Sequence, residues 1–191
     1  MEFNRLLSSV ISAYGEPKLS SSIEEKKTAE KQQTINKKNY HLITSPDQID
    51  EWIKEAEEVG EVAVDTETSS LDPHQADLIG VSLSSKIGKA CYIPIGHKSS
   101  KCIDKNIVIK KLKPLLEDPS VKKIGQNIKF DFIVLYKQGI TISSMEDTML
   151  MSYVLDAGKN RHNMDTLSEI HLGHKTISFK EIVGTLSLIH I

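Results

Sequence analysis

The sequence predicts a layered α/β domain with a mixed central sheet flanked by helices. Two observations favour this fold class: strand-like segments come first in the folded part, and helices interleaved with a further strand come later. That order of elements is typical of α/β layers built around one sheet. With 191 residues and 39% hydrophobic content, the chain is long enough to bury one sizeable core.

The folded part is expected to begin near Tyr40, after an N-terminal stretch of different character. Residues 1–15 have the spacing of a short helix, whereas residues 16–39 are rich in Lys, Glu, Ser, Gln and Thr. That second stretch has almost no large apolar residues, so burial cannot offset the entropy lost on ordering it. We therefore predict a tail and flexible linker over 1–39 and one domain over 40–191.

The first helix of the domain is marked at both ends. Ser45 suits the N-cap, Pro46 the first helical position and Gly60 the stop. Between these ends, Trp52 and Ala56 keep the spacing of an apolar helical face.

Three strands follow over residues 61–65, 78–84 and 90–95, and the turn-rich gaps between them predict an antiparallel meander. The remaining predicted elements are a helix over 106–117, a short strand over 121–125, and helices over 127–138, 147–155 and 164–172. Asp147 is expected to be the N-cap of its helix.

Composition and charge exclude several classes of function. A net charge of -2 argues against a protein that coats duplex DNA. No apolar run approaches the length of a membrane span and no signal peptide is found, so we expect no membrane partner. Cys91 and Cys102 have neither a disulfide-framework pattern nor zinc spacing, which favours reduced thiols in the cytoplasm.

Two acids stand at the end of the first apolar strand, in the sequence VAVDTETSSLD. Side chains at i and i+2 share one face of a strand, so Asp65 and Glu67 can converge on one point. Like charges so close repel unless a cation lies between them or one binds a proton. Oxygen donors without a nearby Cys or His favour Mg²⁺ or Mn²⁺. The alternative is a pair of solvated acids at a strand end.

A third acid lies in the sequence GQNIKFDFIVLY. Helical spacing places Asp131 at the edge of a largely apolar helix, where an unpaired carboxylate is costly. One interpretation pairs Asp131 with a lysine such as Lys129, and the other makes it a third ligand of the same metal site. Three acids on two elements favour two-metal phosphodiester chemistry.

These motifs resemble those of a known family. VAVDTETSSLD is similar to the first motif of the DEDD exonuclease superfamily, and KIGQNIKFD is similar to the second. Residues 147–179 resemble the stretch that follows in the 3′–5′ proofreading domain of the bacterial DNA polymerase I family. The resemblance covers residues 40–184. It implies a ribonuclease H-like fold and an exonuclease that removes 3′-terminal nucleotides from single-stranded DNA during replication and repair.

The resemblance also implies a role for each matching residue. Asp65, Glu67 and Asp131 would be the catalytic carboxylates and would hold two divalent ions, Mg²⁺ or Mn²⁺. A second set would bind the single-stranded 3′ end: Thr68, Leu71, Gln126, Asn127, Phe130, Arg161 and Phe179.

Several members of the second set have individual roles in this resemblance. Leu71 would insert between the last two bases, unless it is a core residue. Arg161 would contact the terminal phosphates, unless it is an ordinary surface cation. Phe179 would stack near the frayed strand. We interpret His162, at a helix entrance, as a packing or capping residue rather than a ligand.

The family's third motif, Tyr-x-x-x-Asp, is absent from the required place. In the family its tyrosine positions the attacking water and its aspartate is the fourth metal ligand. Tyr153 is followed by an aspartate one position too early, and residues 185–191 depart from the family pattern. We therefore expect a C-terminally truncated fragment that lacks the domain's last helix, leaves an apolar surface open and has doubtful activity.

Three functions remain open at this point. The first is the exonuclease domain of a DNA polymerase I, with a polymerase domain in the same longer chain. The second is an RNA-trimming exonuclease of the same superfamily, against which the long match over residues 147–179 argues. The third is a non-catalytic scaffold domain, against which the three retained carboxylates argue.

Overall fold

The computed structural model describes residues 4–15, 39–98 and 101–177, which fall into two compact units. The described part of the first unit is helix α1 (Asn4–Tyr14), as its spacing predicted. The linker predicted over residues 16–39 lies outside the described residues except for Asn39. Everything that follows concerns the second unit.

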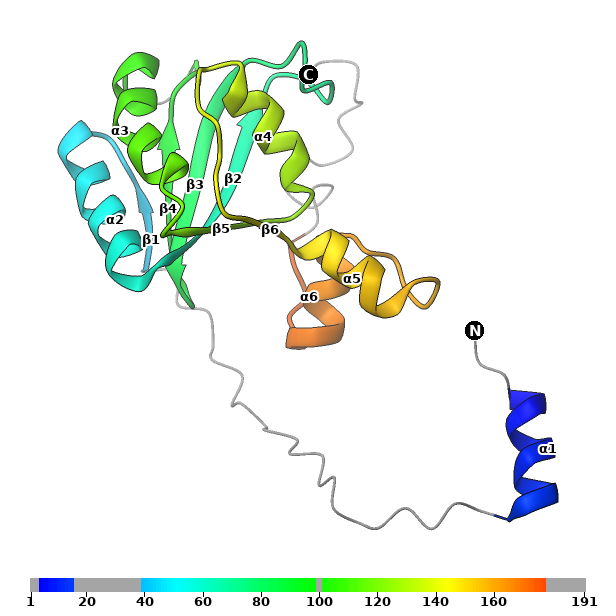
Figure 1. Ribbon diagram of the computed structural model, residues 1–191. Coiled ribbons are helices and arrows are strands. Elements are labelled where there is room, and N and C mark those ends of the chain that lie inside the picture. The colour runs from blue at the N-terminus through cyan, green and yellow to red at the C-terminus, as the bar shows by residue number, and fades with distance from the viewer. Residues whose placement is uncertain (1–3, 16–38, 99–100, 178–191) are drawn as a thin grey trace. The chain divides into compact units, whose positions relative to one another are not determined.

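The second unit is built on a mixed sheet of six strands in the order β1-β4-β3-β2-β5-β6 (Figure 1). The strands are β1 (Tyr40–Leu42), β2 (Glu61–Thr68), β3 (Leu78–Lys86), β4 (Lys89–Pro94), β5 (Lys122–Gly125) and β6 (Met145–Asp147). Strands β2, β3 and β4 form the predicted antiparallel meander. Strand β1 pairs in parallel with β4, and β5 pairs in parallel with both β2 and β6. The predicted α/β class is confirmed.

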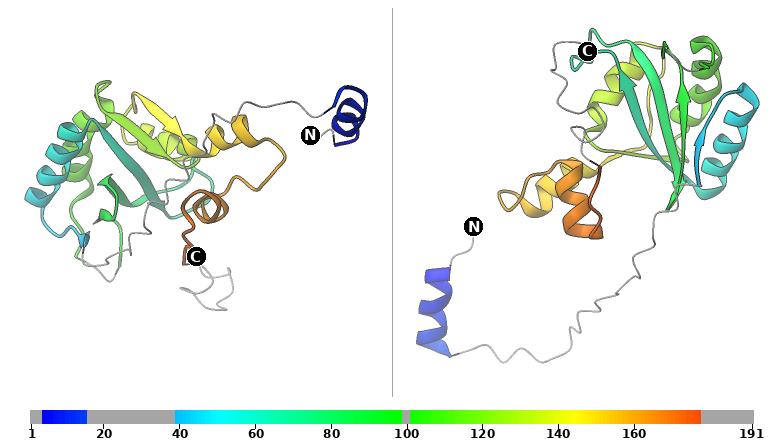
Figure 2. Two further views of the ribbon diagram at one scale, coloured as in Figure 1. Left: turned by 90° about the horizontal axis from the view of Figure 1, so that it is seen from below. Right: turned by 180° about the vertical axis from the view of Figure 1, so that it is seen from behind.

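The helices of this unit are α2 (Pro46–Val59), α3 (Lys105–Glu117), α4 (Ile128–Tyr136), α5 (Thr148–Asp156) and α6 (Met164–Leu172). Helices α2, α3 and α4 lie on one face of the sheet, in front of the strands in Figure 1 and behind them in the reverse view of Figure 2. Their buried side chains join those of β2, β3 and β4 in one core. No helix among the described residues is long and apolar enough to span a lipid bilayer.

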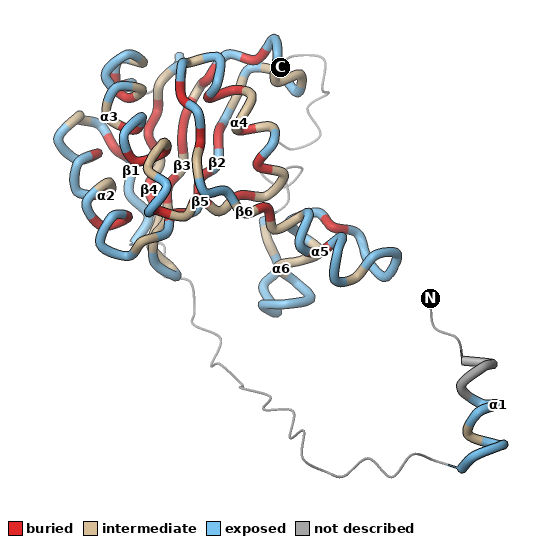
Figure 3. The backbone as a smooth tube through the Cα atoms, viewed as in Figure 1, coloured by how far each residue is buried: buried red, intermediate tan, exposed pale blue. Residues whose placement is uncertain are grey.

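Strand β2 separates the core from the opposite, open face of the sheet. Val62, Val64 and Thr66 are buried, whereas the alternate residues Asp65 and Glu67 reach solvent. Figure 3 shows the buried residues concentrated along the strands and the facing sides of α2, α3 and α4, with α5 and α6 mostly exposed. The period-two burial pattern therefore puts both acids on the face that these three helices leave uncovered.

Helix α2 begins and ends where the sequence predicts. Pro46 is its first residue, and the backbone N–H of Ser45 donates to the side chain of Gln48 at 3.2 Å. Gly60 ends the helix with a φ of 82°, a conformation that glycine adopts without strain.

Two short strands were not predicted. Strand β1 is a three-residue edge strand whose side chains are all exposed, so it carries no alternating pattern. Strand β6 ends at Asp147, so α5 begins at Thr148, one residue later than the predicted helix over 147–155. The helix predicted over 127–138 begins only at Ile128, because Asn127 precedes α4 with a φ of 57°.

Asp147 is the predicted N-cap of α5, and it also caps α4. Its carboxylate accepts hydrogen bonds from the backbone N–H groups of Met149 and Leu150 at 2.9 and 3.3 Å. It further accepts bonds from those of Asn127 and Ile128 at 3.0 and 3.1 Å. One buried side chain thus satisfies the first N–H groups of two helices that meet at the ends of β5 and β6.

We expect Asp147→Ala to lower the free energy of unfolding by about 1–2 kcal/mol, because both helix starts lose their acceptor. Urea unfolding followed by circular dichroism measures this. Asp104→Ala is a matched control, since Asp104 caps only α3, through two N–H groups. An equal loss in the two variants would contradict the double role of Asp147.

Candidate active site

Asp65 and Glu67 lie side by side on the open face of β2. Across the antiparallel pairing with β3, Asp65 is opposite Ser82 and Glu67 is opposite Gly80. The register between β2 and β3 shifts after Glu67, so the regular pairing ends beside this acid. Both carboxylates therefore lie near the end of a strand, as the sequence predicted. Their neighbours on β3 are small residues.

Asp131 is held against the edge of β2 from α4. Its side chain is only 3% exposed, and its Oδ1 accepts hydrogen bonds from the backbone N–H of Thr66 at 2.9 Å and from the Thr66 hydroxyl at 2.6 Å. Strand β2 pairs with β5 only over Glu61–Ala63, so this N–H lies beyond the paired stretch. Asp131 thus accepts the hydrogen bond from the Thr66 N–H that the carbonyl of a neighbouring strand would accept if the pairing continued. Its partner is Thr66, not the lysine considered above.

The three carboxylates influence one another electrostatically. Asp65 reaches solvent, but its carboxylate is partly desolvated by the surrounding protein, and this desolvation raises its pKa. The pKa of Glu67 is raised by desolvation and then by the charge of Asp65. Burial raises the pKa of Asp131 to about 6, with Asp65 adding to the shift and Thr66 opposing it. Asp65 therefore lies within electrostatic range of both other acids, at the centre of an anionic cluster.

The donor chemistry of this cluster fits a hard divalent cation. Within the described residues, no group of three or more His, Cys, Asp or Glu side chains is arranged closely enough to enclose a metal ion. The cluster nevertheless consists of carboxylates alone, and a cation would relieve both their repulsion and their desolvation. Asp65 and Glu67 are its accessible members, and Asp131 has only Oδ1 engaged by Thr66.

Leu71 follows β2 in a loop and is 96% exposed, so it is not a core residue. Thr68, the last residue of β2, uses its hydroxyl to donate to the backbone carbonyl of Ser70 at 2.9 Å, which shapes the start of the same loop. Both residues lie just past the carboxylates in the chain. The loop therefore presents an unburied apolar side chain close in sequence to the acids.

Gln126, Asn127 and Phe130 cluster where β5 passes into α4. The Gln126 amide donates to the backbone carbonyl of His162 at 2.7 Å. Phe130 is partly buried against the core. Arg161 is exposed, in the connection before α6. Phe179 lies outside the described residues.

His162 packs inside the protein, as predicted. Its Nδ1 lies 2.7 Å from the hydroxyl of Ser152, and its ring lies against that of Tyr153 with centroids 3.9 Å apart. These contacts connect the segment before α6 to α5. The histidine is thus a packing residue.

The sequence analysis missed Tyr92 and His97, which lie near the acid pair. The Tyr92 hydroxyl is 2.5 Å from His97 Nε2, and the pKa of Tyr92 is raised by desolvation and then by the charge of Glu67. The available signal was Gly80, a glycine within an apolar strand, which often marks the close approach of another group. Which residue approaches Gly80 depends on strand register, which the sequence pattern did not fix.

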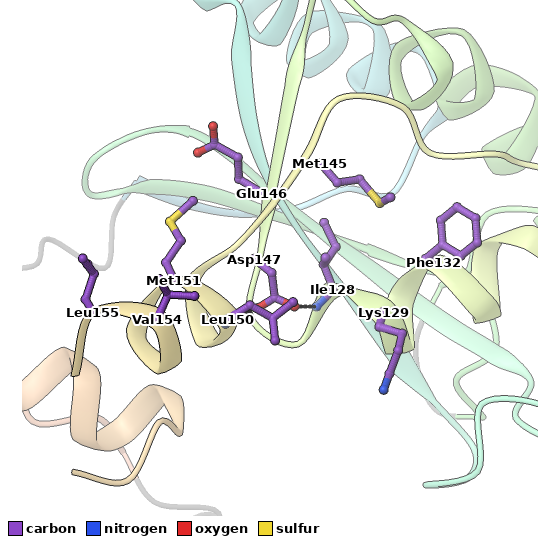
Figure 4. A pocket seen from close by; sticks show the side chains of 10 residues that line it. All are labelled: Ile128, Lys129, Phe132, Met145, Glu146, Asp147, Leu150, Met151, Val154 and Leu155. Carbon is purple, nitrogen blue, oxygen red and sulfur yellow. Dashed lines mark hydrogen bonds between the residues drawn. The ribbon is translucent and has the colours of Figure 1, made fainter. Parts of the chain in front are cut away.

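A separate, apolar hollow of about 760 Å³ lies between α4, β6 and α5 (Figure 4). Most of its lining is apolar: Ile128, Phe132, Met145, Leu150, Met151, Val154 and Leu155. Two acids that border it are already engaged, since Glu146 pairs with Lys122 at 2.9 Å and Asp147 caps the helices. Lys129 is the one basic side chain of its lining, and neither acid is left to hold a metal ion, so we place the candidate active site at the carboxylates of β2 and α4 instead.

Comparison with known proteins places the chain in a family. A family model described as 3′-5′ exonuclease matches residues 40–188. DNA polymerase I of Pseudomonas aeruginosa is 42% identical over 152 residues, covering 76% of this chain and 17% of the relative. DNA polymerase I of Rhizobium leguminosarum is 43% identical over 158 residues, covering 72% of this chain and 16% of the relative. The chain thus spans about a sixth of these relatives.

Solved structures show the same fold. Brucella melitensis NrnC with bound Mg²⁺ has a TM-score of 0.56 and 26% identity, covering 78% of this chain and 69% of that one. The POL domain of Pol1 from M. smegmatis, in complex with DNA primer-template and dNTP, has a TM-score of 0.60 and 20% identity, covering 72% and 23%. These neighbours support the ribonuclease H-like arrangement of the sheet. By the family model over residues 40–188, the chain belongs to the 3′–5′ exonuclease family, and it resembles the matched part of DNA polymerase I.

Proposed function

We propose that Asp65, Glu67 and Asp131 bind two divalent ions, Mg²⁺ or Mn²⁺, for the hydrolysis of 3′-terminal nucleotides from single-stranded DNA. The observation that carries this proposal is the group of three carboxylates at β2: Asp65 and Glu67 on its open face, and Asp131 bonded to Thr66 from α4. Each of its members has a raised pKa, and Asp65 acts on both of the others. Such a group of acids is unfavourable unless protons or cations bind there.

The ions would supply an activated water and stabilise the leaving oxygen. Asp65 and Glu67 would be the exposed ligands, open to solvent and substrate. Asp131 would contribute from the side, directly or through water, while Thr66 holds its Oδ1 in place. The protein would thus fix the direction from which each carboxylate approaches.

A single strand fits the surroundings of the cluster better than a duplex. Leu71 is exposed beyond β2, and Phe130 lies beside Gln126 and Asn127 at the start of α4. Bases stack on apolar and aromatic side chains without a sequence requirement. A net charge of -2 offers little counterion release, on which duplex binding depends.

The matched relatives are polymerases, so we propose that this domain acts beside a polymerase domain in a longer chain. The relatives extend well beyond the matched region, since the chain covers 17% and 16% of them. In that setting the exonuclease would remove the last nucleotide of a frayed primer strand. Proofreading is therefore the proposed role.

RNA trimming is the second candidate function. It is favoured by the likeness to Brucella melitensis NrnC, including a structure of that protein bound to pGG. The curated relatives at higher identity are DNA polymerases, which favours DNA. Comparing 3′-labelled DNA and RNA strands in the assay described in the Discussion separates the two functions.

The metal site can be tested without catalysis. We expect Mn²⁺ to bind weakly, with a calorimetric heat that Asp65→Ala removes, because that variant loses the central carboxylate and lowers the site's charge. Asp77→Ala is the matched control, an exposed acid in the loop after β2. Identical heats for the wild type and Asp65→Ala would remove the metal-site assignment.

A further inference from the structure

The ring of Tyr92 lies across β3, next to the strand position that faces Glu67. Tyr92 is on β4, opposite Ser82 of β3, and its hydroxyl would be 1.9 Å from a Cβ placed on Gly80. The phenol therefore lies directly on the backbone of Gly80, where any larger residue would displace it. Gly80 is the cross-strand partner of Glu67. The absence of a side chain at position 80 thus brings the Tyr92 hydroxyl to the edge of the carboxylate cluster.

His97 fixes the direction of this hydroxyl. Its Nε2 is 2.5 Å from the Tyr92 oxygen, and the two rings meet edge to face with centroids 5.6 Å apart. His97 is exposed and follows β4 by three residues, and the segment before it is held to β3 by bonds from the N–H groups of Ile95 and Gly96 to the carbonyl of Ile79. Desolvation and then the charge of Asp65 raise the pKa of Glu67 while His97 lowers it, and desolvation and then the charge of Glu67 raise the pKa of Tyr92, which agrees with the closeness of these groups.

We propose that Tyr92 is a positioning residue of the carboxylate site, oriented by His97, and that its hydroxyl borders the metal position at Glu67. Hydrogen-bonding groups just outside a metal's ligands orient what the metal binds and tune its affinity. A ring that merely covered β3 would need no hydroxyl and no partner for it. This inference rests on the proposed function, because it assumes that a cation binds at Glu67.

Terbium luminescence tests the closeness of Tyr92 to that cation. Tb³⁺ replaces hard divalent ions at oxygen sites, and it emits when a nearby tyrosine absorbs the exciting light. We expect sensitised emission from the chain with Tb³⁺, its loss in Glu67→Gln, and the loss of most of it in Tyr92→Phe. Tyr136→Phe is the matched control, since Tyr136 is exposed on α4 and stacks on Phe132.

Calorimetry with Mn²⁺ tests the role of the hydroxyl itself. We expect Tyr92→Phe to weaken Mn²⁺ binding about two- to tenfold, the range that one lost hydrogen bond allows. His97→Ala should weaken it similarly, and His97→Gln should restore part of the affinity, because an amide can take over the contact. Gly80→Ala should reproduce the loss while keeping the tyrosine, since the new methyl group displaces its ring.

The outcomes separate this inference from the function on which it rests. If Glu67→Gln loses the emission but Tyr92→Phe keeps it, Tyr92 does not border the site and the inference fails while the metal site stands. Unchanged Mn²⁺ affinity in Tyr92→Phe likewise overturns the positioning role. If no emission depends on Glu67, both the metal site and the inference are contradicted.

Discussion

Asp131→Asn is expected to stabilise the metal-free chain at neutral pH, by about 1–3 kcal/mol. Asp131 is almost fully buried, and desolvation is the main cause that raises its pKa from 3.8 to about 6. At neutral pH the folded protein must therefore hold a charge that burial disfavours. Asparagine has no charge, and its carbonyl oxygen can still accept both hydrogen bonds from Thr66.

The effect should depend on pH in one direction. Because the folded-state pKa lies above the unfolded one, the folded wild type binds more protons between about pH 4 and pH 6, so its stability falls as pH rises through that window. The advantage of Asp131→Asn should be complete above about pH 6 and absent below about pH 4. Urea unfolding in the presence of a chelator, at pH values on both sides of the window, measures this difference.

Asp77→Asn is the control, because Asp77 is exposed and its substitution should change stability little at either pH. A gain in Asp131→Asn that is equal at both ends of the window would show that charge burial is not its cause. A loss of stability at neutral pH would show that the carboxylate, not merely its oxygen, holds α4 to β2. The expected gain would mean that this position is kept acidic at a cost to stability, as functional sites often are.

The parts of the site that the sequence predicted are those fixed by local geometry. Asp65 and Glu67 share a face because strands alternate, and Asp147 caps α5 because capping concerns the next few residues. The bonds from Thr66 to Asp131 span 65 positions, and the second cap of Asp147 reaches back to Ile128. Such contacts depend on how β2, β5 and β6 pair. No spacing rule along the chain contains that information.

The fold shows the same division between local and distant causes. The meander of β2, β3 and β4 follows from turn-rich gaps, and α2 follows from its capping residues. Strand β1 exists only because β4 offers a free edge to pair with. The approach of Tyr92 to Gly80 likewise requires the register of β3 and β4. These features come from tertiary pairing, which overrides weak local preference.

Residues 1–191 are expected to show negligible 3′–5′ exonuclease activity. Hydrolysis by two metal ions requires both ions and an oriented water in line with the scissile bond. The described site contributes three carboxylates, of which Asp131 has an oxygen held by Thr66. The family resemblance implies a fourth carboxylate and a tyrosine that aims the water, in a motif that these residues lack.

The size of the effect follows from how strictly the reaction depends on geometry. A misplacement of about 1 Å can reduce the rate about a hundredfold, and the loss of a ligand together with an orienting group should reduce it further. A chain extended by the family's next segment, with its Tyr-x-x-x-Asp motif, should therefore cleave at least about a hundredfold faster than residues 1–191. Asp65→Ala in the extended chain should abolish that cleavage, and Asp77→Ala should leave it intact.

The assay is the release of mononucleotides from a 3′-labelled single strand with Mg²⁺, run in parallel on DNA and RNA of one sequence. Preferred release from DNA is expected for a proofreading domain, and preferred release from RNA would favour the trimming function instead. Robust cleavage by residues 1–191 that Asp65→Ala removes would mean that another side chain completes the site. Tyr92 would then be the first candidate to test, because its hydroxyl already lies at the edge of the cluster beside Glu67. An extended chain that stays inactive would show instead that these carboxylates do not form a catalytic site.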